Sequence, residues 1–67
     1  MIMEDYQKRV LKEKEDLDER ITSLRSFLNS DKCPKTCGQQ QFILMRIQLS
    51  AMNEYSDVLR QRIEAFS

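Results

Sequence analysis

The sequence predicts an all-α protein: a two-helix antiparallel hairpin that assembles into a four-helix bundle or a higher homo-oligomer. Apolar residues spaced seven apart run along the chain. The two series in the second half are Met45, Met52, Leu59 and Phe66, and Phe42, Leu49 and Ile63; the series in the first half is Met3, Val10, Leu17 and Leu24. Such spacing places side chains on one face of a helix. A single Gly and a single Pro leave little from which to build the turns of a β fold. The 67 residues, 1–67, are therefore expected to form one domain.

The first helix is predicted over residues 4–29. Glu4 and Asp5 lie in its first turn, where acidic side chains favour the positive end of the helix dipole. Its apolar positions are mostly three and four apart, as an amphipathic helix requires. Glu13 and Lys14 interrupt this stripe. The middle of the first helix is therefore expected to pack weakly.

A connector is predicted over residues 30–35, followed by a second helix over 37–66. Pro34 disfavours helical backbone at Cys33, so the first helix cannot continue through it. Thr36 and Gln39 have the spacing of a capping box at the start of the second helix. A connector of this length is typical between antiparallel helices.

The second helix carries more apolar surface than one partner helix covers. The two heptad series of the second half form the main stripe of this helix, and Ser56 interrupts one of them. At 100° per residue, a second apolar group lies beside this stripe. We call this group the apolar flank: Leu44, Ile47, Ala51, Tyr55 and Val58. A contiguous exposed apolar patch usually marks an interaction surface, and a chain this short is marginal alone. The flank is therefore the predicted partner and oligomer interface, with a homodimer as the expected assembly.

The composition argues against several classes of function. Eleven basic and 11 acidic residues cancel, which disfavours nucleic acid or an anionic membrane as the main partner. No apolar run reaches the length of a membrane span, and Glu4 and Asp5 follow the first residues directly, so neither a membrane span nor a signal peptide is expected. The chain has no histidine to act as a base, so no catalytic residue, and no enzyme, is expected. A reducing cytoplasm is the expected compartment.

Cys33 and Cys37 allow three interpretations. They are incidental thiols, a reversible disulfide, or half of a metal site shared between subunits. Zinc prefers four ligands, and the chain has no third cysteine and no histidine. No metal and no cofactor is therefore expected.

Two tyrosines and two arginines suggest a possible ligand site: Tyr6, Arg9, Tyr55 and Arg62. In an antiparallel hairpin, the end of the second helix faces the start of the first. Aromatic rings beside arginines can stack a base and bind a phosphate, which suits a small nucleotide. The alternative is that the tyrosines lie at an interface with their hydroxyls at its rim.

Both halves of the chain contain a pattern of residues that is shared with known proteins. In the first half it is Tyr6-Gln7-x-Arg9-Val10, Glu13-x-x-x-Leu17-Asp18 and Leu24-x-x-Phe27-Leu28, and in the second half it is Gln48-Leu49-x-x-Met52-x-x-Tyr55-Ser56-x-x-Leu59-x-x-Arg62-Ile63. In these residues the chain resembles a family of very small phage- and prophage-encoded proteins. The resemblance covers most of the chain, excludes the cysteine segment and carries over no site residues. It implies expression in the cytoplasm of a bacterial host.

Three functions follow as hypotheses. The leading one is an interaction protein that binds and inhibits a host protein, such as an antiviral defence protein. The second is an oligomeric sponge for a cyclic nucleotide signal. The third is a passive helical oligomerisation module. A pull-down that yields one stoichiometric host protein would favour the first, and heat-extractable nucleotide would favour the second.

Overall fold

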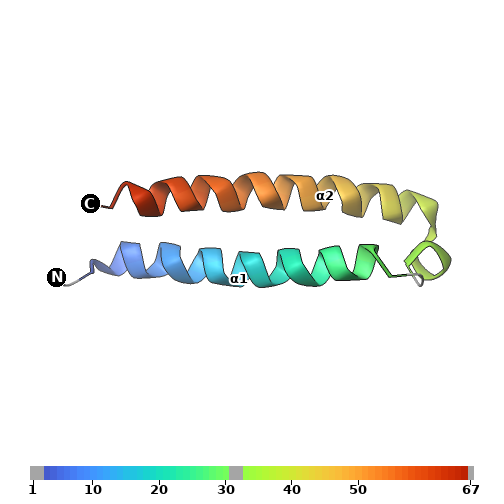
Figure 1. Cartoon of the computed structure of the whole chain (residues 1–67), viewed down its shortest axis with the longest axis horizontal. Helices are drawn as coiled ribbons and strands as arrows, with labels where there is room; N and C mark the ends of the chain where they lie inside the picture. Colours follow the sequence, from blue (N-terminus) through green and yellow to red (C-terminus); the bar gives the residue numbers. More distant parts are fainter. Residues whose placement is uncertain (1–2, 31–32, 67) are drawn as a thin grey trace.

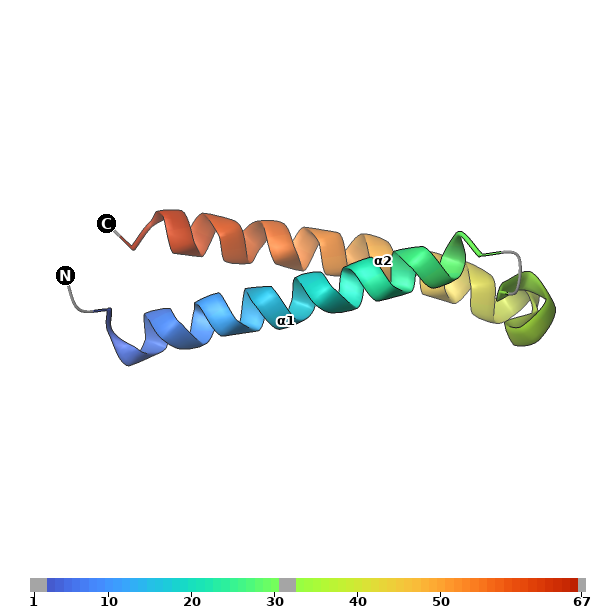
Figure 2. The same ribbon diagram turned by 60° about the horizontal axis from the view of Figure 1, so that its bottom comes forward.

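The protein is an antiparallel pair of long helices. The computed structural model describes the backbone of residues 3–30 and 33–66, and side chains in 3–30 and 38–66. These residues form α1 (Asp5–Leu28) and α2 (Cys33–Glu64) and contain no strand. The two helices lie side by side in a rod about 50 Å long and 14 Å across (Figures 1 and 2). The predicted helical hairpin is confirmed.

Local hydrogen bonds define both ends of α1. The backbone N–H of Glu4 donates to Gln7 Oε1 at 2.8 Å, which satisfies a donor that the helix leaves without a partner. At the other end, Ser30 Oγ donates to the carbonyl oxygen of Phe27 at 2.7 Å. These two contacts explain why the helix lies within the predicted range 4–29 without a capping serine or threonine.

The start of α2 differs from the predicted connector. A helical turn already begins at Cys33, inside the segment 30–35, and Gly38 with φ 79° and ψ 161° separates it from the rest of α2. Pro34 is compatible with this arrangement, because the first turn of a helix needs no backbone donor there. Only glycine adopts the Gly38 conformation readily. The predicted capping box depends on Thr36, whose side chain lies outside the described residues.

The core is a narrow seam between the helices. Among the described residues, four side chains are buried: Val10, Leu17, Ile21 and Leu59. Half-buried residues pack against them: Leu49, Met52, Ile63 and Phe66. Val10, Leu17 and Leu59 belong to the predicted heptad series, and Ile21 lies one turn after Leu17. The predicted helix phase therefore places the apolar stripe correctly. None of the described residues between 22 and 50 is buried, so the segments nearer the turn contribute no buried side chain.

The middle of α1 does not have the gap that its sequence suggests. Val10 and Leu17 are buried on either side of Lys14. Lys14 is itself only partly exposed and reaches across to α2, where Ser56 interrupts the apolar series. The two interruptions therefore face one another and form polar contacts.

Candidate binding pocket and exposed flank

The apolar flank lies on the surface of α2. Leu44 is 49% exposed, Ile47 61%, Tyr55 44% and Val58 52%, and Ala51 is also exposed. Isolated exposed apolar residues are ordinary, but these five share one helix face. The hairpin thus leaves this face without a partner helix of its own, as the spacing predicts.

The predicted tyrosine–arginine site is not assembled by contacts in this hairpin. The ring of Tyr6 packs edge-on against Phe66, with centroids 5.9 Å apart and planes at 85°. Tyr55 belongs to the apolar flank and lies eleven residues, or roughly 16 Å, along α2 from Phe66. Arg9 and Arg62 are exposed. Among the described residues, no hydrogen bond, ion pair or ring contact joins Tyr6, Arg9, Tyr55 and Arg62 to one another.

A different pair of arginines lines a pocket between the two helices. Its volume is about 310 Å³. The residues that line it are Arg25, Leu28 and Asn29 of α1 and its C-terminal cap, and Arg46, Leu49, Ser50 and Asn53 of α2. We call this the basic pocket. It lies in the half of the hairpin nearer the turn, and no acidic side chain is among its lining residues.

The charges of the two arginines in the basic pocket are not neutralised by an ion pair with any described residue. Arg25 Nη2 donates a long hydrogen bond, 3.4 Å, to Asn53 Oδ1. The guanidinium carbon of Arg46 lies 5.8 Å from the centroid of the Phe42 ring, a cation–π distance. Guanidinium groups bind phosphate and carboxylate through paired hydrogen bonds, so this pocket has the chemistry of an anion site.

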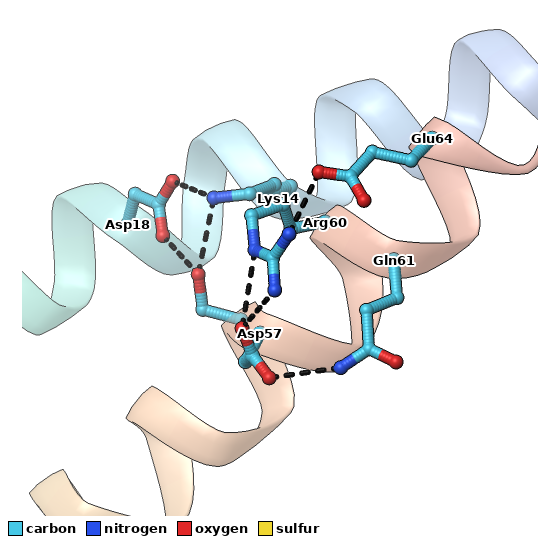
Figure 3. Close-up of polar contacts among 7 residues, drawn as sticks. Lys14, Asp18, Asp57, Arg60, Gln61 and Glu64 are labelled. Carbon is cyan, nitrogen blue, oxygen red and sulfur yellow. Dashed lines mark hydrogen bonds and ion pairs between the residues drawn. The ribbon is translucent and has the colours of Figure 1, made fainter.

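Three other basic residues of the described chain form ion pairs, unlike Arg25 and Arg46: Lys12, Lys14 and Arg60. Arg60 contacts Asp57 at 2.7 Å and Glu64 at 2.7 Å. Figure 3 shows this group, in which Gln61 Nε2 also donates to Asp57 Oδ2 at 2.9 Å. Hydrogen bonds from Arg60 and then Gln61 lower the pKa of Asp57. These four residues therefore contact one another on the surface of α2.

The second paired group joins α1 to α2. Lys14 Nζ lies 2.7 Å from Asp18 Oδ2 and 3.1 Å from Ser56 Oγ, and the Ser56 hydroxyl donates to Asp18 Oδ1 at 2.6 Å. The hydrogen bonds from Lys14 and then Ser56 lower the pKa of Asp18. Figure 3 shows Lys14 and Asp18 of α1 close to the Arg60 group of α2. We call Lys14, Asp18 and Ser56 the polar cluster.

A comparison with protein-family models decides the family. The model described as Sequestin matches residues 4–65, which is nearly the whole chain. The chain belongs to the Sequestin family. Comparison with curated proteins and with solved structures gives no match. The family name indicates a protein that sequesters another molecule, which agrees with the interaction class expected from the sequence.

The Sequestin match includes the apolar flank and every lining residue of the basic pocket. Sequence reasoning missed this pocket, because Arg25 and Arg46 are 21 residues apart and belong to a balanced set of charges. The sequence did offer one signal. Arg25 precedes the predicted turn and Arg46 follows it, and neither has an acidic residue three or four positions away with which to pair. In the hairpin the two positions come together.

Further features of this Sequestin chain limit the ligands that it can bind. A shallow groove on α1 is lined by Glu15, Asp18 and Glu19, whose charge opposes an anionic ligand.

In the described part of the chain, no three Cys, His, Asp or Glu side chains are grouped to hold a metal ion. The side chains of Cys33 and Cys37 lie outside that part, so their three interpretations remain as they were. Within the described residues, neither helix is both long and apolar enough to cross a membrane.

Proposed function

We propose that this protein sequesters a small phosphate-bearing ligand, a nucleotide signal, in the basic pocket and releases it chemically unchanged. One observation carries the proposal: two arginines without ion-pair partners line the same pocket from different helices. The family name, which indicates sequestration, supports it. A cyclic nucleotide is the ligand class that the resemblance to small phage proteins had already suggested.

The other lining residues suit the remaining parts of a nucleotide. Asn29, Ser50 and Asn53 offer amide and hydroxyl groups for hydrogen bonds to a sugar or a base. Leu28 and Leu49 offer an apolar wall for one face of the base. A volume of about 310 Å³ is at the small end of known ligand pockets, so it matches one nucleotide unit.

The absence of histidine from the sequence favours binding over catalysis. The chain has no imidazole to transfer a proton near neutral pH. A protein that binds a signal without converting it removes only as much of the signal as its own binding sites can hold. In the proposed setting, a phage protein in the cytoplasm of a bacterial host lowers the free concentration of a defence signal.

Inhibition of a host protein is the second candidate function. The exposed side chains of the apolar flank favour it, because apolar anchors within a polar rim are typical of protein interfaces. This function requires that the flank be free in the assembled protein. A stoichiometric host protein recovered from lysate, and lost with Ile47→Asp, would support it.

Calorimetric titration tests the nucleotide proposal. The probes are cyclic AMP, cyclic di-AMP and inorganic phosphate, each titrated into the purified protein. We expect saturable binding of at least one cyclic nucleotide. Heating the complex should return the intact nucleotide, as judged by chromatography. If none of the probes binds at micromolar protein concentration, the proposal for this ligand class fails.

Two matched variants locate the site. Arg25→Ala with Arg46→Ala removes both pocket charges and should weaken binding at least tenfold, because charge-assisted hydrogen bonds contribute about 1.5–3 kcal/mol each. Arg9→Ala with Arg20→Ala removes the same charge from exposed positions outside the pocket. It should bind like the wild type. The reverse result would place the ligand elsewhere on the hairpin.

A further inference from the structure

The spacing of the apolar flank is symmetric. Its residues, Leu44, Ile47, Ala51, Tyr55 and Val58, follow one another at intervals of three, four, four and three. Reversing the direction of the helix about Ala51 therefore reproduces the same set of positions. The next positions on this face continue the symmetry, because Gln40 precedes Leu44 by four residues and Arg62 follows Val58 by four.

We infer that the flank is covered by the same flank of a second copy, with the two α2 helices antiparallel about a two-fold axis at Ala51. A two-fold interface must be self-complementary, so that each contact occurs twice. In this register Leu44 meets the partner's Val58, and Ile47 meets the partner's Tyr55. Ala51 meets its own copy on the axis. This inference concerns assembly and does not depend on the ligand proposal.

The sizes of the residues fit this register. The smallest side chain lies at the centre, where two helices packed 8–10 Å apart approach most closely. The larger residues lie on either side, and each layer then combines two apolar side chains. Tyr55 pairs a large apolar surface with a hydroxyl at the edge of the interface, which is the usual position of an interface tyrosine.

Polar residues end the interface on both sides. In the symmetric register Gln40 lies opposite the partner's Arg62, and the amide oxygen of the glutamine can accept from the guanidinium. Both side chains are exposed in the hairpin, and Arg62 forms no ion pair with any described residue. Arg62, suggested by the sequence as a ligand residue, therefore has a role at the interface.

A second copy is favoured over an unrelated partner for two reasons. The flank can pair with its own copy in register, because its spacing is the same in both directions and a two-fold interface requires this self-complementarity. The single hairpin also buries only four of its described side chains, and small domains of this kind commonly gain stability by association. The basic pocket lies about 150° around α2 from the flank, at 100° per residue, so it stays open in the dimer.

Sedimentation equilibrium at micromolar concentration tests the assembly. We expect a mass of twice the 8.0 kDa chain, or a multiple of that dimer. Ile47→Asp should reduce the mass to one chain while circular dichroism remains helical. Ile43→Asp is the matched control: Ile43 is also exposed, at 49%, but lies outside the flank. It should keep the oligomer.

Disulfide trapping tests the register. In a Cys33→Ser, Cys37→Ser background, Ala51→Cys should oxidise to a covalent dimer, because the two positions adjoin across the axis. Gln61→Cys is the control, since in this register it lies roughly 30 Å from its own copy. A wild-type monomer, an oligomer that survives Ile47→Asp, or a crosslink at Gln61→Cys and none at Ala51→Cys would overturn the inference. A monomer that binds a host protein through the flank would assign this surface to a foreign partner and likewise overturn it.

Discussion

Lys14 Nζ lies 3.1 Å from Ser56 Oγ, and this contact joins the interruption in the apolar stripe of α1 to the interruption in that of α2. Asp18 completes the polar cluster. A slip of one heptad would place Lys14 beside Leu49 or Ile63, where neither residue offers a side-chain acceptor. Polar contacts at an apolar interface are known to specify register in this way. The cluster therefore selects one alignment of the two helices.

The first prediction concerns the strength of this cluster. A double-mutant cycle with Lys14→Ala and Ser56→Ala should give a coupling of about 0.5–1 kcal/mol, because the contact is only partly shielded from water. Urea denaturation measures it. The same cycle on Lys12 and Asp16, an exposed pair within α1, should give a smaller coupling, because water screens both charges. Equal coupling in both cycles would mean that the inter-helix contact has no special weight.

The second prediction concerns acid. Hydrogen bonds lower the pKa of Asp18 in the folded protein below its ordinary value of 3.8. The folded state thus favours the ionised carboxylate. The resulting stabilisation is complete above the ordinary pKa and is lost as the pH falls through the folded pKa. Asp18→Asn should therefore lose stability relative to the wild type at neutral pH, and the difference should shrink below about pH 4.

Thermal melts between pH 2 and 7 measure this difference. Glu19→Gln is the control, because Glu19 is exposed and accepts no hydrogen bond from the described residues. A gap between Asp18→Asn and the wild type that stays constant down to pH 2 would show that the carboxylate is not held in its ionised form by the cluster.

The third prediction ranks core truncations. Leu59 is fully buried, so Leu59→Ala should cost about 2–5 kcal/mol of unfolding free energy. Leu49 and Leu11 are only half-buried, so their alanine variants should cost less. Ile43→Ala, at an exposed position outside the apolar flank, should cost little. Chemical denaturation of the four variants gives the order, and similar losses at Leu59 and Leu11 would contradict the helix phase.

The fourth prediction concerns the break in α2. Gly38→Ala should destabilise by about 1–3 kcal/mol, because alanine strongly disfavours this backbone conformation. Space does not limit the substitution, since no atom lies within 4 Å of an added Cβ. Gln39→Ala is the control. Equal stability of Gly38→Ala and the wild type would show that α2 can continue as a straight helix through this position.

The fifth prediction concerns the cysteines. Cys33→Ser with Cys37→Ser should leave the melting temperature and ligand binding unchanged, since the sequence offers no histidine or further cysteine to complete a zinc site. Metal analysis of the purified wild type should find no stoichiometric zinc. A large drop in melting temperature with a chelator would contradict this expectation.

The hairpin and its seam were predictable because heptad spacing fixes which helix face is apolar. The polar cluster was not, because a charged residue in an apolar stripe looks like a gap. Lys14 fills that gap with its alkyl stem, and its ammonium meets an acceptor 42 residues away. The basic pocket was missed for a similar reason: Arg25 and Arg46 become neighbours only after the chain reverses. The exposed face of α2 was predictable, since helical periodicity alone places it.

Burial is uneven along the rod, and this has a consequence for local unfolding. The four buried side chains lie within residues 10–21 of α1 and at Leu59 of α2, while the segments that line the basic pocket, residues 25–29 and 46–53, contain no buried side chain. Amide hydrogens around Leu17 and Leu59 should therefore exchange more slowly than those around Leu28 and Leu49. A ligand that bridges Arg25 and Arg46 would slow exchange mainly in these less protected segments, and so would even out protection along the molecule.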